Sequence, residues 1–284
     1  FRARQIWRWL AIGRATTFAE MTDLPARLRD QLDESIPVWA TRVVSHQQSE
    51  DGSEKLLLEF SSGGQAECVL LRDGDRRTIC VSSQVGCAMG CVFCASGLDG
   101  IDRDLDAGEI IEQMVRLQHC LPAEERISHI VMMGMGEPLL NFDNVMEAVN
   151  IMMEDCAYGL SKRKVTISTS GVVPAIDRLK DFTDASLAVS LHAPNDELRS
   201  QIMPINNKYP ISELLRSVQG YMDSLADKRV PVIEYTMIKG VNDHRAHARE
   251  LATLLREFPC KINIIPFNPF SLSDYRRPST SSIA

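Results

Sequence analysis

The chain has 284 residues, of which 44% are hydrophobic and 24% charged, and its formal net charge is −7. This is the composition of a globular protein with an ample core, and no apolar run approaches the ~20 residues of a membrane-spanning helix. The acidic total does not indicate nucleic-acid binding, although that property depends on local patches rather than on the sum.

Eight cysteines occur without a visible secretory signal. This combination predicts a reducing compartment, the cytoplasm, where thiols bind metal or do chemistry instead of forming structural disulfides. Both ends of the chain look truncated. It opens at Phe1 without an initiator Met, and it stops at Ala284 shortly after a turn-like run.

Residues 1–72 are expected to form a small N-terminal accessory domain. The expected elements are helices over 3–10 and 24–32 and strands over 55–60 and 66–71. Ser-Ser-Gly-Gly separates the two strands and is a good hairpin signal.

From residue 73 onward, short apolar runs alternate with longer helical stretches. The expected strands are 78–82, 129–133, 165–168, 186–191, 232–237 and 262–266. The expected helices are 108–119 behind an Asp106 cap, 143–153, 173–179, 211–225 and 244–258. Nearly continuous apolar strands alternating with helices predict a covered parallel sheet. Because a complete eight-fold barrel needs ~250 residues, the pattern favours an α/β fold with an open six-unit (β/α)6 partial TIM barrel over residues 73–284.

Three cysteines, Cys87, Cys91 and Cys94, follow the first strand of this barrel in the run CAMGCVFC. Iron–sulfur clusters normally take four thiolates, so a trio suits a 4Fe-4S cluster with one open iron. The spacing also permits a zinc site completed by a remote Cys or His.

The second strand ends in GMGEP, which contains Gly136 and Glu137. Glycines let a ligand approach the backbone closely, and a carboxylate there accepts hydrogen bonds from an ammonium group. The motif alone is equally compatible with a tight turn carrying a solvated Glu. Similarly, His192 alone is compatible with a satisfied core histidine.

The cysteine loop at a strand end resembles the radical S-adenosylmethionine superfamily. The resemblance implies that the open iron is chelated by the amino and carboxylate groups of S-adenosylmethionine, whose reductive cleavage yields a 5′-deoxyadenosyl radical. It also implies a set of cofactor-binding residues at the strand ends: Gly136, Glu137, Ser168, Ser190, Leu191, His192 and Asn268.

Longer motifs sharpen the resemblance over nearly the whole chain: TICVSSQVGCAMGCVFC, VMMGMGEPLLN, LSKRKVTISTSGVVPA, SLHAPND, MPIN and CKINIIPFNPF. Together they resemble the adenine-carbon-2 RNA methyltransferases, which act on 23S rRNA and, in some bacteria, on tRNA. A sister family methylates carbon 8 of the same adenosine. Val85 and the Leu-Leu-Asn run after GMGEP look closer to the carbon-2 enzymes.

The resemblance implies an indirect mechanism, because carbon 2 of adenine is not nucleophilic. One S-adenosylmethionine methylates a cysteine and a second supplies the radical, which makes two per turnover. A transient protein–RNA bond is then resolved through a disulfide. Cys80 matches the resolving cysteine of the family, and Glu67 matches its general base. The methyl-carrying cysteine of the family lies in a C-terminal Ala-Cys-Gly-Gln segment, which the sequence to Ala284 does not contain.

The resemblance also implies partners: 23S rRNA, possibly tRNA, and a flavodoxin-type one-electron reductant, with no membrane partner. Candidate RNA contacts are the N-terminal helices, with Arg2, Arg4, Arg8 and Arg14, and the basic run 162–164. Three other readings remain open at this point: the carbon-8 enzyme, a radical activase or mutase on the same barrel, and a zinc-stabilised RNA-binding module.

Overall fold

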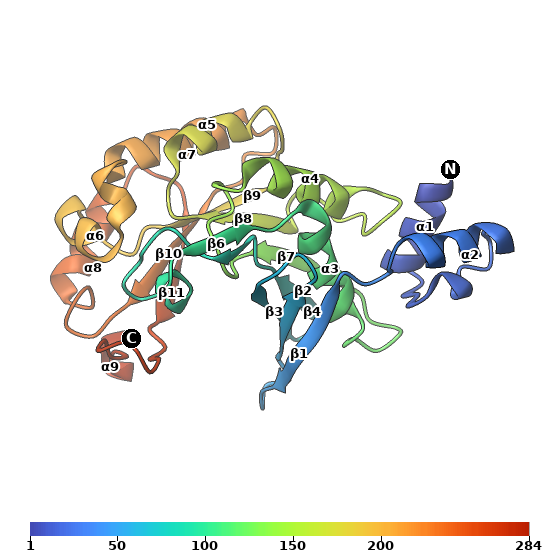
Figure 1. Cartoon of the computed structure of the whole chain (residues 1–284). Coiled ribbons are helices and arrows are strands. Elements are labelled where there is room, and N and C mark those ends of the chain that lie inside the picture. The colour runs from blue at the N-terminus through green and yellow to red at the C-terminus, as the bar shows by residue number, and fades with distance from the viewer. Residues whose placement is uncertain (284) are drawn as a thin grey trace. The chain divides into compact units, whose positions relative to one another are not determined.

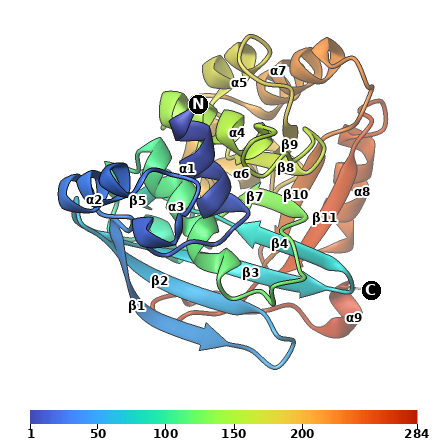
Figure 2. The same cartoon turned by 90° about the vertical axis from the view of Figure 1, so that its right-hand side faces the viewer.

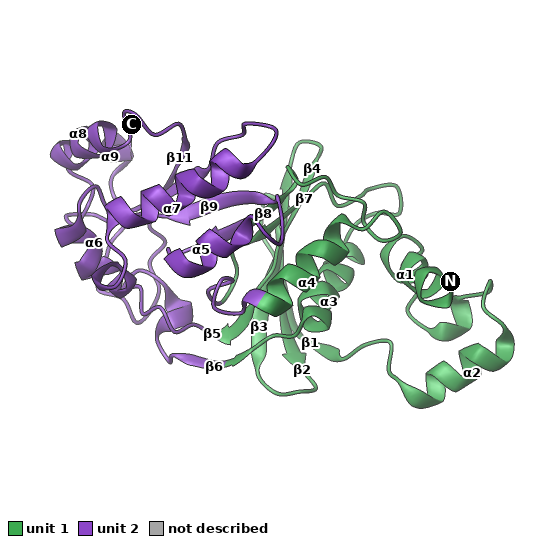
Figure 3. Ribbon diagram, turned by 90° about the horizontal axis from the view of Figure 1, so that it is seen from above, with its two compact units in different colours: residues 1–85, 103–135, 143–166 green, residues 86–102, 136–142, 167–284 purple. Residues whose placement is uncertain are grey.

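The computed structural model describes residues 1–283, which form two compact units (Figure 3). Unit 1 comprises residues 1–85, 103–135 and 143–166, and unit 2 comprises residues 86–102, 136–142 and the chain from 167 onward. Each unit combines separate stretches of sequence. The predicted boundary at residue 72, by contrast, divides the chain at a single point of the sequence into an accessory domain and a barrel. That boundary stays a prediction.

The N-terminal part of unit 1 folds around a small core of its own. Helices α1 (Arg2–Ala11) and α2 (Ala26–Ser35) flank a 3-10 turn, η1 (Phe18–Glu20). Phe18 and Met21 are buried there with Ala15 and Leu24, and apolar side chains of both helices pack against them. Both predicted helices are confirmed, although α2 begins two residues later than expected.

Four antiparallel strands follow in unit 1 (Figure 2): β1 (Thr41–Gln48), β2 (Glu54–Phe60), β3 (Gln65–Asp73) and β4 (Arg76–Cys80). The predicted β2–β3 hairpin is confirmed. Strand β1 was not predicted, because its sequence TRVVSHQQ is mostly polar and nearly all of its residues are exposed or half-buried. Strand β2 alternates strictly between buried and half-buried residues, as a strand with one covered face does.

The six predicted parallel strands are all present, in chain order. Unit 1 holds β4 and, parallel to it, β7 (His129–Met132). The chain passes into unit 2 within β8 (Val165–Thr169), and unit 2 continues with β9 (Ser186–Ser190), β10 (Val232–Met237) and β11 (Lys261–Pro266), of which β9, β10 and β11 pair in parallel. Among the described strands, β11 pairs only with β10, so the sheet ends there and the barrel is open, as predicted.

Helices separate these strands in the predicted order (Figure 1): α3 (Ala107–Gln118), α4 (Phe142–Met153), α5 (Val173–Leu179), α7 (Ile211–Ser224) and α8 (Arg245–Leu254). Asp106 caps α3 as expected: its Oδ1 accepts from Glu109 N at 2.8 Å, and Glu109 Oε2 accepts from Asp106 N at 2.9 Å. Short elements escaped prediction: β5 (Gln84–Gly86), η2 (Ala95–Gly97), β6 (Ile101–Asp104), α6 (Asp196–Ile202), η3 (Pro204–Asn207) and α9 (Thr280–Ile283). No helix of the described chain has the length and apolarity needed to span a membrane.

Gly134 lies where β7 ends, against buried backbone of the preceding strand segment. A Cβ at this position would lie 2.6 Å from Ser82 Oγ and 2.8 Å from Ser82 N. Ser82 cannot move aside easily, because its hydroxyl donates to Glu67 O at 2.6 Å and accepts from Met135 N at 2.8 Å. The site therefore excludes any side chain.

We expect Gly134→Ala to lower the free energy of unfolding by about 1–3 kcal/mol, the usual cost of overpacking a filled site. Gly220→Ala is the matched control: Gly220 lies within α7 with no atom within 4 Å of an added Cβ, so the substitution should stabilise the protein by about 0.5–1 kcal/mol. Urea denaturation of both variants measures the two effects. A Gly134→Ala protein as stable as the wild type would contradict the packing described here.

Candidate functional site

The cysteine loop begins directly after β5 and lies in unit 2. Cys87 N donates to Gly100 O at 2.8 Å, and Cys94 N donates to Cys91 O at 3.1 Å, which closes a tight turn. Gly86 has φ +76, and a Cβ there would lie 2.2 Å from Gly100 O. Only glycine fits this position, which sets the direction in which the loop leaves the strand.

The loop rests on the segment around α6. Val92 N donates to Ile202 O at 3.1 Å, and Cys91, Val92 and Phe93 pack against a small core of Ala193, Ile202 and Met203. The backbone between Cys91 and Cys94 is therefore held against this small core.

The three thiols influence one another. Burial raises the pKa of Cys91 to about 12, and the nearby Cys94 and Cys87 add to the rise. Burial is also the main reason that the pKa of Cys87 is raised, with Glu137 and Cys94 contributing. Burial therefore disfavours the thiolate forms of Cys87 and Cys91, and a nearby cation would favour them.

The donor set of unit 2 fits a cluster with one open iron. Besides the triad, this unit contains one more cysteine, Cys260, and only burial raises the pKa of its thiol. The other four cysteines of the chain belong to unit 1. Three soft thiolates without a fourth are the ligands that an iron–sulfur cluster with an open position requires.

Glu137 follows Gly136 in the GMGEP turn, and its carboxyl group is buried, with the residue 2% exposed. Its Oε2 accepts from both Ser170 N and Ser170 Oγ at 2.7 Å, and its Oε1 accepts from Leu139 N at 3.0 Å. Burial raises the pKa of Glu137, and these donors oppose the rise. The carboxylate thus joins the GMGEP turn to the end of β8, which a solvated Glu on a tight turn would not do.

His192 is 4% exposed and has a positive φ of +57. Its Nδ1 accepts from Thr236 N at 2.9 Å, which leaves the ring proton on Nε2. Its ring lies edge-on to Phe93, with centroids 4.6 Å apart. Burial, with the nearby Arg199 cation, lowers the pKa of His192 to about 3. The imidazole is therefore neutral and can donate only from Nε2.

The remaining expected cofactor residues also lie in unit 2. Ser168 is half-buried on β8, and Ser190 is half-buried at the end of β9 beside the fully buried Leu191. Asn268 differs from these, because it is exposed beyond β11 and its Oδ1 accepts from Arg277 Nη1 at 3.2 Å.

Glu67 and Cys80 lie in unit 1, on adjacent antiparallel strands. Cys80 pairs directly with Val69, two residues from Glu67 on β3. Because residues i and i+2 of a strand share a face, as do direct cross-strand partners, Glu67 and Cys80 point to the same face of the sheet. This is the half-buried face, opposite to buried Cys68.

The two groups have different surroundings. Glu67 is 45% exposed by side chain, and one of its oxygens lies 2.8 Å from Lys55 Nζ. Cys80 is more enclosed, and burial raises the pKa of its thiol to about 11. The structure thus brings an accessible carboxylate and an enclosed thiol to one face, and their roles as base and resolving cysteine, which the resemblance implies, stay a prediction.

Arg14, expected among the RNA-contacting arginines, has a structural role. Its guanidinium donates to Leu121 O at 2.7 Å, Pro122 O at 3.0 Å and Glu125 O at 2.6 Å. It therefore fastens the N-terminal segment to the loop after α3. Arg2, Arg4 and Arg8 are exposed on α1.

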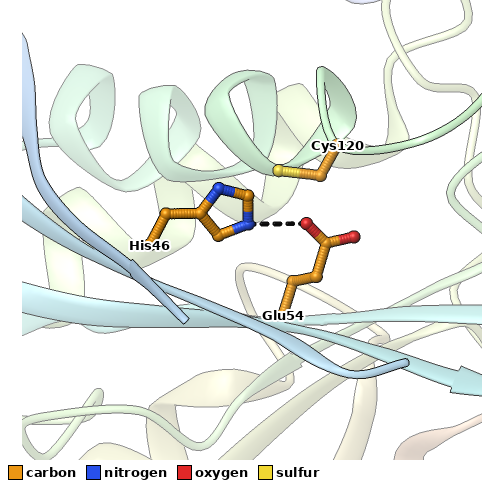
Figure 4. A group of neighbouring side chains, drawn as sticks. All are labelled: His46, Glu54 and Cys120. Carbon is orange, nitrogen blue, oxygen red and sulfur yellow. Dashed lines mark hydrogen bonds and ion pairs between the residues drawn. The ribbon is translucent and has the colours of Figure 1, made fainter. Parts of the chain in front are cut away.

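Another group of potential metal ligands lies in unit 1 (Figure 4). Atoms of His46, Glu54 and Cys120 lie within 4.8 Å of one another. Both oxygens of the buried Glu54 carboxylate are engaged, Oε2 with His46 Nε2 at 2.6 Å and Oε1 with Arg72 Nη2 at 2.7 Å. The Arg72 cation neutralises the carboxylate and repels a metal ion, so we assign this group to an ion-paired network.

The neutral His192 gives stability a pH dependence of known sign. The pKa is near 6.5 in the unfolded chain and about 3 in the folded one. Between pH 3 and pH 6.5 the unfolded state therefore binds a proton at His192 that the folded state does not. The stabilisation of the folded state by this residue is complete above pH 6.5 and is lost as the pH falls toward 3.

We expect the free energy of unfolding to fall by up to about 1.4 kcal/mol per pH unit from this residue between pH 6.5 and 5.5. His192→Asn should flatten that slope, whereas the control His244→Gln, which changes an exposed histidine, should not. Denaturant titrations at pH 7.5, 6.5 and 5.5 test this. Equal slopes in the His192→Asn and wild-type proteins would contradict a buried neutral imidazole.

Comparison with known proteins places this geometry in a family. The model described as the radical SAM superfamily matches residues 81–252, and the model described as the ribosomal RNA large subunit methyltransferase N-terminal domain matches residues 1–38. The chain is similar to the dual-specificity RNA methyltransferase RlmN of Marinobacter nauticus, with 52% identity over 99% of this chain and 78% of the relative. It is also similar to a probable dual-specificity RNA methyltransferase RlmN of Rhodopirellula baltica, with 54% identity over 100% and 76%.

A solved structure extends the likeness to three dimensions. The crystal structure of a radical SAM methyltransferase from Sphaerobacter thermophilus matches with a TM-score of 0.94 and 44% identity, covering 99% of this chain and 83% of that one. The predicted fold class and the predicted family are both confirmed by these likenesses.

Proposed function

Because the chain belongs to the radical SAM superfamily and, within it, to the dual-specificity RNA methyltransferases, we propose that it methylates carbon 2 of an adenosine in RNA. The observation that carries the proposal is the three-thiol loop at a strand end, in a chain that is 52% identical to such an enzyme over 99% of its length. The names of these relatives favour RNA methylation over the carbon-8 reading, the radical activase or mutase and the zinc-stabilised module.

In this proposal Cys87, Cys91 and Cys94 hold a 4Fe-4S cluster. When bound, the cluster supplies the electron that cleaves S-adenosylmethionine reductively. The chain's own contribution is to fix the thiols on packed structure, since Cys91 packs against Ile202 and Met203.

Strand-end residues of unit 2 bind S-adenosylmethionine: Gly136, Glu137, Ser168, Ser190, Leu191, His192 and Asn268. Glu137 sets the shape of the GMGEP turn through its bonds to Ser170 and Leu139. His192 offers only an N–H donor from Nε2, because Nδ1 is occupied. Turnover consumes two molecules of the cofactor, one as methyl donor and one as radical source.

Glu67 and Cys80 act on the RNA adduct. Glu67 removes the ring proton as general base, and its ion pair with Lys55 orients the carboxylate. Cys80 then forms a disulfide with the sulfur of the family's methyl-carrying cysteine, while the bond between that sulfur and the carbon attached to the base breaks and the carbon takes up a proton to become the methyl group. Its raised pKa keeps the Cys80 thiol protonated until this step.

The proposed substrates are 23S rRNA and tRNA, and the proposed electron donor is a flavodoxin-type reductant in the cytoplasm. The exposed arginines of α1, Arg2, Arg4 and Arg8, suit contact with phosphates, which supply much of the affinity for nucleic acids. The basic run at 162–164, next to β8, is a second candidate contact.

Cluster binding gives the most direct test of the cysteine assignment. Anaerobic reconstitution should give about four iron atoms per chain, and Cys91→Ala should reduce this several-fold and abolish 5′-deoxyadenosine formation. Cys260→Ala is the matched control and should retain the iron, because Cys260 does not belong to the triad. Iron analysis measures the iron content of both variants. Full iron content in the Cys91→Ala protein would contradict the assignment of Cys91 as a cluster ligand.

The reaction itself is tested with the protein expressed from its gene. Mass spectrometry of digested 23S rRNA and tRNA should detect 2-methyladenosine, and Cys80→Ala should accumulate a covalent protein–RNA adduct because the resolving thiol is missing. Cys68→Ala changes a neighbouring buried cysteine on the opposite face and should release product normally. Detection of 8-methyladenosine instead would assign the chain to the sister activity.

A further inference from the structure

Arg199 is a completely buried arginine in α6, with 0% exposure. Its guanidinium donates four hydrogen bonds, which no sequence pattern indicates. The acceptors are Leu191 O at 3.1 Å, Asn206 Oδ1 at 2.9 Å, Ser170 O at 2.6 Å and Ser190 O at 3.0 Å. All four acceptors are neutral.

A buried cation normally has an anionic partner, because the desolvation of a charge costs several kcal/mol. Among the described residues, no carboxylate accepts a hydrogen bond from Arg199. After the Cys91 thiol, the acidic group that acts on Arg199 is Asp196, but its Oδ1 accepts from Asn206 Nδ2 at 3.0 Å and from Ile211 N at 2.8 Å. The protein part alone therefore leaves the Arg199 charge without a hydrogen-bonded counter-charge.

The position of Arg199 indicates where the counter-charge belongs. Ile202, three residues farther along the chain, accepts a hydrogen bond from Val92 N at 3.1 Å, and Cys91 packs against the same core. The Arg199 cation opposes the rise in the pKa of the Cys91 thiol, so the two groups are electrostatically close. The cysteine loop thus rests on the helix that carries the unpaired cation.

We propose that Arg199 is a positioning residue whose buried charge compensates the thiolate-ligated cluster and raises its reduction potential. The inference rests on the proposed function, because it requires a cluster on Cys87, Cys91 and Cys94. The potential of an iron–sulfur cluster depends on nearby charge, hydrogen bonding and burial. A fixed cation favours the reduced, more negative form, and a guanidinium keeps its charge at every accessible pH.

Its hydrogen bonds give Arg199 a second effect. It joins the ends of β8 and β9 through Ser170 O and Ser190 O, next to the residues proposed to bind S-adenosylmethionine. Charge and positioning are separable, because lysine retains the charge but cannot make the four bonds.

The test compares Arg199→Gln, Arg199→Lys and the wild type, each reconstituted with cluster. EPR-monitored potentiometric titration measures the potential, and iron analysis confirms loading. In Arg199→Gln the ratio of reduced to oxidised cluster at a fixed applied potential should fall about tenfold, which is 59 mV for one electron. Lys208→Gln removes an exposed cation as the matched control and should leave the ratio unchanged.

Arg199→Lys provides a second test, which can be carried out even if the Arg199→Gln protein does not fold. A buried ammonium loses its proton more easily than a guanidinium. The cluster potential of this variant should equal the wild-type value near pH 6.5 and fall as the pH rises to 9.5, while the wild type shows no such fall. Calorimetry should show weaker cofactor binding in this variant, because the carbonyls of β8 and β9 lose donors.

The outcomes separate the two proposals. A wild-type protein that assembles no cluster contradicts the proposed function. A cluster that assembles with the same potential in Arg199→Gln as in the wild type contradicts the role of Arg199 alone. If the neutral variant does not fold, a pH-independent potential in Arg199→Lys overturns the proposal.

Discussion

The site in unit 2 depends on one residue, Ser170, that lies between the buried carboxyl group of Glu137 and the buried guanidinium of Arg199. Its N–H and hydroxyl donate to the Glu137 carboxylate at 2.7 Å, and its carbonyl accepts from the Arg199 guanidinium at 2.6 Å. Three hydrogen bonds from two sides orient Ser170 strongly, and the one from the Arg199 guanidinium is charge-assisted. The end of β8 is therefore fixed in both directions.

The other strand ends are connected to this arrangement. Arg199 also holds Ser190 O and Leu191 O at the end of β9, while Leu191 N and His192 N donate to Glu234 O of β10. Parallel strands leave unpaired backbone groups where they stop, and buried groups of this kind must be satisfied. Here side chains satisfy them, so the loops that carry the proposed cofactor residues are held by the same bonds that complete the sheet.

The sequence predicted those features that depend on local pattern. Apolar, β-branched runs identified β8 to β11, and Asp106 identified the start of α3. It did not reveal β1, whose polar residues show no buried face, or the short helix α6. Nor could it reveal Arg199, since a buried arginine and an exposed one look alike in sequence. Only the tertiary fold determines which carbonyls surround a guanidinium.

For Glu67 and Cys80, the family resemblance and the pairing of β3 with β4 point to the same conclusion, that the two residues act together. Read singly, they are a strand carboxylate and a strand cysteine, separated by thirteen positions. The β3–β4 pairing sets Cys80 opposite Val69, and the two-residue period of the strand then turns Glu67 to the same face. A slip of one residue would turn Cys80 to the buried face that Cys68 occupies. In the proposed reaction both groups act on one RNA adduct and must therefore lie on one face. The proposed chemistry thus requires this register of β3 against β4, whose opposite face carries the buried Leu70 and Ile79.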